Sequence, residues 1–579
     1  QLSHELALQF AAKCFTHLEI AHFKDNFKIL ADHQEDVEYW KEETLCRFLA
    51  LPDALKVGSV VYAMLTYLGA FPFPVLAPCI VDRQAMLKAV TILTGRYKTV
   101  LKKGNSDRNK LLFRSLAVFD RRTSVASPTP EKSPEHDLKV ASGFKVDQPI
   151  NDEEEEDDDD LALAALDALD AIEVFQHDEK RDRLINHAHI PAYNFERLIM
   201  LLLLLASLTP QDSIGQLSTD LSENQISALE ASAKSIVAAF EPEGGGIRYV
   251  TFVKVMTAGT PYLFRALSPL FEHFLFSKQM DLHKHRTEID AHQAQKALQR
   301  SPFQEVKGSE ILNNGLLAQL STSIELKATT DTTSSWFHSG LRMNRLYSTS
   351  SHGTSLSSFS RQVMSWRSSS LLILRGTCAG QTYVLGAYLP EQWKEAGSHT
   401  EESAEAHKTA VMFQIAPRHA IFRSNPYNRT TPLSHFSSKT GISLGCVIPA
   451  SSRINASSQT PILGPVSLII DEDISTVTFQ HDGGAGTGAF LTDPLLEEAQ
   501  SHGRGQDKKL EIDIDGMEVW GMSFADAGED EVAAQQSRLA WEEAEAARRR
   551  GVNFGGDKDG ARHLLEMAGL VGAGAGNRS

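Results

Sequence analysis

Cysteine is scarce in this chain of 579 residues, and its five copies are scattered. They are Cys14, Cys46, Cys79, Cys378 and Cys446, and no two of them form a C-x-x-C pair. An odd, dispersed set of thiols excludes a disulfide framework and a zinc site of the finger type, and it indicates a reducing compartment. The expected location is therefore cytoplasmic.

The sequence also lacks a hydrophobic run long enough to cross a membrane. Its most apolar stretch, Leu198 to Leu208 (LIMLLLLLASL), is far shorter than the roughly 20 residues that span a bilayer. It predicts a buried core helix. We expect no transmembrane segment, a prediction that leaves peripheral membrane association open.

No dense stripe of Lys and Arg is present either. The formal net charge is −17, and the unbroken acidic run Asp152 to Asp160 (DEEEEDDDD) carries −9 of it, leaving −8 for the rest. Nucleic-acid binding depends on basic side chains that contact phosphates and release counterions. Direct contact with DNA or RNA is therefore not expected.

Shifts in composition and periodicity divide the chain into six segments. A 3.6-residue apolar period predicts helices, and a stretch rich in Ser, Pro and acid cannot bury enough apolar surface to fold. The predicted segments are a helical unit at 1–125, a disordered acidic linker at 126–160, a second helical unit at 161–285, a linker at 286–307, a mainly β domain at 308–524 and a helical tail at 525–579.

Within the second helical unit, Ile226 to Met256 has the outline of an EF-hand, with a helix, a Gly-rich loop and a second helix. The calcium-ligand positions of such a loop fall on Phe240, Pro242, Gly244 and Thr251, which offer no carboxylate. We expect an EF-hand-like unit without bound metal.

After about residue 300 the apolar period changes from 3.6 to 2, which predicts strands. The candidates are Leu371–Arg375, Thr382–Tyr388, Val411–Ile415, Ala420–Arg423, Ile442–Ile448, Val466–Ile470, Thr476–Gln480, Leu510–Ile514 and Met517–Trp520. Short connections, including the expected turns Ala379-Gly380 and Asp515-Gly516, favour an antiparallel sandwich. The predicted fold class is α+β, with a helical N-terminal half, a C-terminal antiparallel β-sandwich with flanking helices, and a helical tail.

Four ordered motifs in this β region resemble the TLDc-domain family. They are Leu346 to Phe359 (LYSTSSHGTSLSSF), Ser370 to Gly376 (SLLILRG), Val384 to Tyr388 (VLGAY) and Met517 to Gly521 (MEVWG). The residues that carry the motifs are Gly353, Glu518, Trp520 and Gly521. In the tail, Trp541 to Ala546 and Leu564 to Val571 are similar to the ending of a fungal subfamily linked by name to telomere capping.

This resemblance implies a β-sandwich wrapped by helices, acting as a non-enzymatic adaptor or regulator. It also implies protein partners, among them subunits of the vacuolar proton-pumping ATPase, support of oxidative-stress resistance, a peripheral location on the vacuole membrane, and an indirect influence on telomere capping. The family has no agreed active site, so the resemblance supplies no catalytic, cofactor or metal residue.

The role of Glu518 stays open at this stage. A carboxylate among β-core residues can accept hydrogen bonds from buried backbone donors, contact a partner, or act as an acid in a cleft. We rank the structural role first, the partner contact second and catalysis last. The alternative function is an antioxidant enzyme in the TLDc domain, which would need an exposed thiol of low pKa.

Three further patterns resemble chemical sites. Gly441 to Gly445 (GISLG) has the letters of a nucleophile elbow, but the following residues predict a strand rather than a helix, so we expect Ser443 to be an outward strand residue. Gly483 to Gly488 (GGAGTG) lacks the Lys-Ser/Thr of a P-loop. The histidine groups at 283–292 and at 187 and 189 predict solvated side chains rather than a metal site.

Overall fold

The computed structural model describes residues 2–34, 37–73, 76–101, 105–119, 185, 188–208, 221–276, 308–326, 336–337, 341–395, 402–428, 430–449, 460–483, 486, 488–501 and 508–524. The predicted acidic linker at 126–160, the linker at 286–307 and the tail at 525–579 lie outside them. Over the described residues, no helix combines the length and the apolar composition that a membrane crossing needs.

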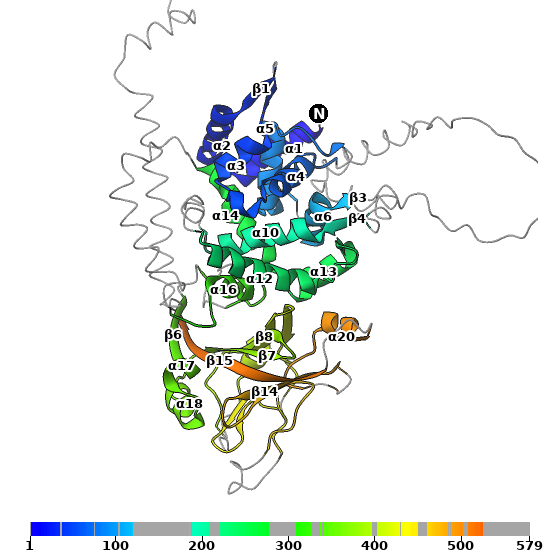
Figure 1. The fold of residues 1–579 in the computed structure, drawn as a ribbon. Helices are drawn as coiled ribbons and strands as arrows, with labels where there is room; N and C mark the ends of the chain where they lie inside the picture. The colour runs from blue at the N-terminus through cyan, green and yellow to red at the C-terminus, as the bar shows by residue number, and fades with distance from the viewer. Residues whose placement is uncertain are drawn as a thin grey trace, which may run out of the picture. The chain divides into compact units, whose positions relative to one another are not determined.

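The first part of the chain folds into helices around an apolar core (Figure 1). Its elements are α1 (Leu2–Cys14), α2 (His17–Leu30), β1 (Asp32–Gln34), β2 (Val37–Tyr39), α3 (Glu42–Leu49), η1 (Asp53–Leu55), α4 (Gly58–Leu68), α5 (Arg83–Leu93), η3 (Arg96–Thr99), α6 (Asn105–Leu116) and β3 (Val118–Phe119). Polar side chains cap the N-termini of several helices. Thr16 and Glu19 form a capping box on α2, and Asp82 accepts a hydrogen bond from the backbone of Ala85 in α5.

The apolar period that predicted helices in residues 1–125 corresponds to buried side chains, among them Phe10 of α1 and Met86 of α5, which are both fully enclosed. A second set of elements follows at β4 (Ala188–Pro191), α10 (Ala192–Leu204), η5 (Leu205–Ser207), α12 (Glu223–Ala239), β5 (Gly246–Arg248), α13 (Tyr249–Ala258), η6 (Leu263–Ala266), α14 (Leu267–Glu272) and η7 (His273–Leu275). The apolar run from Leu198 lies in α10 and is buried from Leu198 to Leu203, which confirms a core helix.

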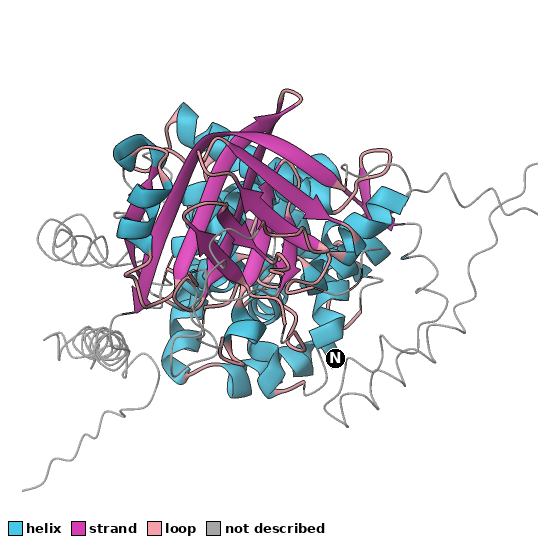
Figure 2. Cartoon of the chain, turned by 90° about the horizontal axis from the view of Figure 1, so that it is seen from below, coloured by secondary structure: helices cyan, strands magenta, loops and turns pink. Residues whose placement is uncertain are grey.

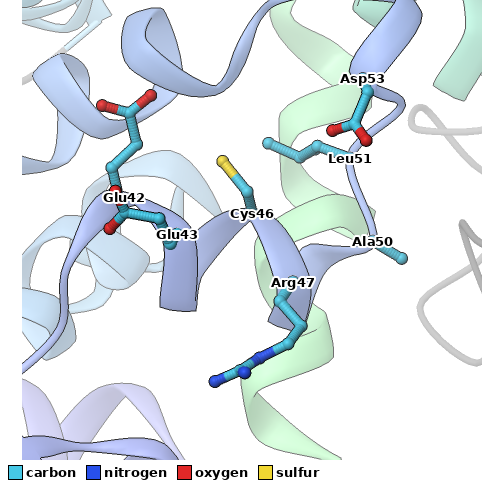
Figure 3. Close-up of a pocket in the computed structure, with 7 residues that line it drawn as sticks. All are labelled: Glu42, Glu43, Cys46, Arg47, Ala50, Leu51 and Asp53. Carbon is cyan, nitrogen blue, oxygen red and sulfur yellow. The ribbon is translucent and has the colours of Figure 1, made fainter.

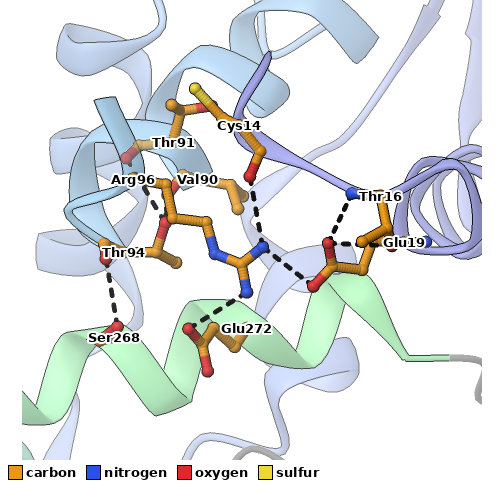
Figure 4. Close-up of polar contacts among 9 residues, drawn as sticks. All are labelled: Cys14, Thr16, Glu19, Val90, Thr91, Thr94, Arg96, Ser268 and Glu272. Atoms are coloured by element: carbon orange, nitrogen blue, oxygen red, sulfur yellow. Dashed lines mark hydrogen bonds and ion pairs between the residues drawn. The ribbon is translucent and has the colours of Figure 1, made fainter. Parts of the chain in front are cut away.

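Arg96 joins the two sets of helices (Figure 4). Its guanidinium donates to the Glu19 carboxylate at 2.9 Å and to the Glu272 carboxylate at 3.4 Å. Close by, Ser268 of α14 donates to the Thr94 carbonyl at 3.3 Å. Because Arg96 and its partners are largely removed from water, these contacts bind α14 firmly to the first helices.

The EF-hand-like outline is present, and it occurs twice. The segment α12, β5 and α13 forms one helix–strand–helix unit, and α6, β4 and α10 form another. The two units join where β4 and β5 pair antiparallel, with Ile190 opposite Ile247. Phe240, assigned from the sequence to the first ligand position, instead packs against Phe195 with ring centroids 5.0 Å apart.

The long stretch of chain after β3 starts and ends in one β-ladder. Strand β3 pairs antiparallel with β4, so that Val118 lies opposite His189 and Phe119 lies opposite Ala188. The two ends of this stretch are therefore neighbours within the unit formed by α6, β4 and α10.

The C-terminal part is built on a ten-stranded antiparallel sheet (Figure 2). Its elements are α16 (Asn314–Ser321), β6 (Leu341–Ser348), α17 (Thr349–His352), α18 (Leu356–Val363), β7 (Ser370–Cys378), β8 (Gln381–Leu389), α19 (Ala406–Thr409), β9 (Val411–Ala416), β10 (Ala420–Arg423), β11 (Ser434–Ser437), β12 (Gly441–Leu444), β13 (Val466–Ile470), β14 (Thr476–His481), α20 (Pro494–Ser501) and β15 (Lys509–Phe524).

Strand β15 occupies the middle of this sheet. The strand order is β10-β9-β8-β7-β15-β14-β13-β12-β11, and β6 also pairs with β15. In the strand order of the sheet, β15 thus lies between the meander β7 to β10 and the meander β11 to β14. Side chains from both meanders enclose one core, in which Phe422 of β10 faces Phe479 of β14 at 5.7 Å. The predicted α+β class with an antiparallel sheet domain is confirmed.

Several details of the strand prediction were wrong. The expected turn at Asp515-Gly516 is a register shift inside the single strand β15, which pairs with β7 on both sides of it. The prediction missed β6 and β11, and β12 ends at Leu444. The turn at Ala379-Gly380 is present, with both residues at positive φ.

Candidate functional site

The four family-motif residues lie along the junction of β6 and β15. Glu518, Trp520 and Gly521 belong to β15, where Glu518 lies opposite Ser348 and Gly521 lies opposite Asn344 of β6. Gly353 follows α17, the short helix that directly succeeds β6. The sequence motifs are therefore brought together in the fold, although their side chains do not converge on one cavity.

Glu518 is a buried carboxylate with several hydrogen bonds. Its side chain is 1% exposed. Oε2 accepts from the Ser309 hydroxyl at 2.5 Å and from the Trp520 indole N–H at 3.0 Å. Oε1 accepts from the Glu310 backbone N–H at 3.0 Å. The Arg345 guanidinium lies 3.9 Å from Oε1, so a positive charge faces the buried negative one.

These contacts hold the chain entry to the domain against the sheet. The Ser309 hydroxyl that donates to Glu518 also accepts from the backbone N–H groups of Ile311 and Leu312, at 3.2 and 2.7 Å. On either side, Arg345 donates to the Gly308 carbonyl at 2.6 Å and Arg375 donates to the Glu310 carbonyl at 3.2 Å. Since both oxygens of Glu518 are engaged, the geometry is that of a structural acceptor.

Trp520 and Gly521 shape the packing around β15. Trp520 is 1% exposed, and its ring nitrogen is held by Glu518 two residues earlier on the same face of the strand. At Gly521, a Cβ would lie 2.7 Å from the ring of Trp366. Trp366 in turn donates from its indole nitrogen to the Ser369 carbonyl at 2.8 Å. Gly521 is thus needed because an indole ring lies directly on its backbone.

Gly353 ends α17 in a conformation that favours glycine. Its φ is +76°, in the left-handed region. Its carbonyl accepts a hydrogen bond of 2.6 Å from the Tyr347 hydroxyl, and burial raises the pKa of Tyr347 to about 12. Tyr347 packs edge-on against Phe359 of α18. Gly353 therefore serves the turn that connects β6 to α18.

Four of the five thiols do not have the properties of peroxide-reactive cysteines. Burial raises the pKa of Cys14, Cys46 and Cys79, and it raises the pKa of Cys446 to about 12. A reactive thiolate needs the opposite shift together with access to solvent. No thiol among these four is therefore prepared for attack on a peroxide.

A pocket of about 580 Å³ opens beside α3 (Figure 3). Its lining residues are Glu42, Glu43, Cys46, Arg47, Ala50, Leu51 and Asp53. Burial and then the surrounding carboxylates, Glu42 first, disfavour the thiolate of Cys46. The described part of the chain holds no cluster of His, Cys, Asp and Glu suited to a metal ion. The pocket thus contains neither an activated nucleophile nor a metal-ligand set.

The patterns that resembled chemical sites are accounted for by their surroundings. Ser443 lies in β12 but is 1% exposed, so the prediction of an outward residue was wrong because both faces of this strand are covered. Gly483 faces the carboxylate of Glu497, which a Cβ at this glycine would overlap and which would repel a phosphate. His189 packs its ring on Gly246. The other histidines of these groups lie outside the described residues.

Comparison with known proteins agrees with this geometry. The family model of the TLDc domain matches residues 306–523. Restriction of telomere capping protein 5 of Aspergillus flavus is 39% identical over 614 residues, which cover 99% of this chain and 96% of that protein. The protein of the same name from Emericella nidulans is 39% identical, and the match covers 100% of this chain and 92% of that protein. The one from Colletotrichum graminicola is 38% identical, and the match covers 99% of this chain and 96% of that protein.

The central sheet and its matched motifs define a TLDc-domain protein. Similarity over nearly the full length then narrows the assignment, and the chain belongs to the restriction of telomere capping protein 5 family of fungi. The resemblance found in the sequence motifs is confirmed.

Proposed function

We propose that this chain is a non-enzymatic adaptor or regulator that acts by binding a protein assembly through its TLDc domain. The proposed partners are subunits of the vacuolar proton-pumping ATPase, and the proposed place of binding is the cytoplasm or the surface of the vacuole membrane. Support of oxidative-stress resistance and an indirect influence on telomere capping would follow from that binding.

The observation that carries the binding role is the exposure of Tyr427. This side chain is 88% exposed, the largest fraction among the large hydrophobic side chains of the described residues. Tyrosine is enriched among the residues that dominate protein interfaces, because it combines a large apolar ring with a polar hydroxyl.

The loop that carries Tyr427 is fixed in place before any partner arrives. The Asn425 side chain accepts from the Tyr427 backbone N–H at 3.0 Å and donates to the Gly488 carbonyl at 3.1 Å. The Asn428 side chain accepts from Thr431 and donates back to its carbonyl. A rigid loop loses little conformational entropy on binding, so the ring is a pre-organised anchor.

A second apolar pair lies in the same domain. Val447 and Ile462 are 44% and 57% exposed, and they exchange two backbone hydrogen bonds of 2.9 Å. Together with Tyr427 they give this domain fixed apolar contacts of the kind a protein partner buries. The hydrogen-bonded Glu518 and the raised pKa values of four thiols speak for binding rather than for the antioxidant alternative.

The test is affinity isolation of the tagged full chain from fungal lysate, with mass spectrometry of the proton-pump subunits. We expect recovery with the unaltered chain and a loss of about ten-fold or more with Tyr427→Ala. The matched control is Tyr193→Ala, which removes another exposed tyrosine, at 61%, from the helical half.

The outcomes separate the parts of the proposal. Pump subunits at background level with the unaltered chain would refute the proposed partner. Equal recovery with Tyr427→Ala would refute the anchor role of this ring. Catalytic consumption of peroxide by the purified chain, abolished when Cys378 of the TLDc domain is replaced by Ser, would establish the enzymatic alternative instead.

A further inference from the structure

The tip of the β9–β10 hairpin contacts the helical half of the chain. Strand β10 is the terminal strand of the sheet, and the tip runs from Ile415 to His419. Ser235 of α12 makes two hydrogen bonds there. Its hydroxyl donates to the Ile415 carbonyl, and its carbonyl accepts from the His419 backbone N–H at 3.0 Å.

An ion pair strengthens the same contact. The Arg418 guanidinium lies 2.8 Å from the carboxylate of Glu241, the residue two positions beyond the end of α12. The side chains are 13% and 28% exposed, so water screens their attraction only in part. Arg418 also donates to the Leu495 carbonyl at 3.4 Å, which fixes the direction of its side chain.

The other side of the tip is held by α16. The Gln319 amide nitrogen donates to the Ile415 carbonyl at 2.9 Å and lies 3.2 Å from Nδ1 of His419. The carbonyl fixes the amide orientation, so Nδ1 must accept and Nε2 must carry the hydrogen. That nitrogen then donates to the Ser323 hydroxyl at 2.7 Å. The tip is thus clasped between α12 and α16.

Further polar side chains lie on the elements that meet at this interface. Ser232 Oγ, Gln319 Oε1 and Gln414 Oε1 are buried without a hydrogen-bond partner among the described residues. Ser232 belongs to α12, Gln319 to α16 and Gln414 to β9, so all three lie on the elements that meet here. The contact between the two helices and the hairpin tip is therefore rich in polar groups.

We infer that the tip of the β9–β10 hairpin is a latch that holds α12 of the helical half against the terminal strands of the sheet and releases it when the tip contacts are broken. An interface held by a few directional hydrogen bonds and one ion pair can open without unfolding of the parts that it joins.

The test is hydrogen exchange of the full chain followed by mass spectrometry, with the substitutions Arg418→Gln and Ser235→Ala. We expect exchange in α12 and in β9 to β10 to rise at least ten-fold, while exchange in β7 and β15 stays unchanged. The control is Glu230→Gln, which breaks the exposed pair of Glu230 with Lys234 on α12 and leaves the tip intact.

Two results would overturn the latch. Unchanged exchange in α12 would mean that the tip contacts do not hold the helix. An equal rise across β7, β15 and α12 would mean that the substitutions weaken the whole fold and that no separate opening exists. If Arg418→Gln fails to fold, Ser235→Ala decides the matter, since it removes a single hydroxyl.

Discussion

Val118 and His189 are partners in one antiparallel ladder, although the chain between them includes the acidic run from Asp152 to Asp160. The chain segment between these two strands therefore begins and ends at adjacent points of the helical half. Its length is therefore not a requirement of the fold, because the paired strands already bring its ends together.

Replacement of residues 124–180 by a short Gly-Ser linker should leave the fold intact. Closing a shorter loop costs less entropy, so we expect the free energy of unfolding to rise by about 1–2 kcal/mol. Circular dichroism and thermal unfolding measure this. A Gly-Ser replacement of the original length is the control for sequence as opposed to length, and loss of the folded state with both replacements would contradict the prediction.

Removal of the Glu518 carboxylate should weaken the domain strongly. Glu518→Ala leaves the donors of Ser309, Glu310 and the buried Trp520 without their acceptor, and we expect a loss of about 3–5 kcal/mol in denaturant unfolding. Glu518→Gln keeps one acceptor oxygen and should lose less. Wild-type stability in Glu518→Ala would show that the carboxylate is not the structural acceptor described above.

A side chain at position 521 should collide with Trp366. Gly521→Ala places a Cβ 2.7 Å from that ring, and we expect destabilisation by about 1–3 kcal/mol. The double variant Gly521→Ala with Trp366→Leu should recover part of the loss relative to Trp366→Leu alone, because the collision partner is gone. Purely additive effects in the unfolding midpoints would argue against direct contact.

Acid should destabilise the clasp at His419. Burial lowers the pKa of this fully enclosed ring from 6.5 to about 4, and the nearby charges of Arg418 and Glu241 bind each other. The unfolded ring therefore takes up a proton first as the pH falls. The contribution is complete above about pH 6.5 and is lost by about pH 4, with a total on the order of 3 kcal/mol.

The measurement is the free energy of unfolding as a function of pH in this window. His419→Asn removes the titrating group, so its stability should fall less steeply with acid than that of the unaltered chain. His33→Asn, at an exposed position, is the control and should leave the slope unchanged. Identical slopes for His419→Asn and the unaltered chain would contradict the assignment.

Local periodicity was sufficient to predict the described helices of the N-terminal half and most strands of the C-terminal sheet, because burial of one face repeats along each element. Strand β6 was not predicted because Arg345 follows the exposed Asn344 and breaks the alternation of buried and exposed residues, and Arg345 lies beside Glu518. Asp and Gly are residues that favour turns, so Asp515-Gly516 predicted one. In the structure β7 pairs with β15 on both sides of this pair, and the hydrogen bonds of the sheet outweigh the local preference of the two residues for a turn.

The hydrogen bonds around Glu518 show that local sequence patterns do not predict contacts between residues that are far apart in the sequence. Motifs singled out Glu518 and Trp520, which lie two residues apart. Ser309, which completes the carboxylate's hydrogen bonds, is 209 positions away, and no local pattern connects the two. The clasp at His419 is likewise made by residues from three separate elements, so only the fold brings it together.

The central place of β15 has a consequence for synthesis on the ribosome. Each flanking meander is continuous in sequence, but the strand that pairs with both of them, residues 509 to 524, is the last strand of the sheet to be translated. The sheet of the nascent domain therefore cannot be completed until that strand leaves the exit tunnel. A premature stop before Lys509 would remove the strand that pairs with both β7 and β14, and it would release a chain with two exposed sheet edges for chaperones and proteases to clear.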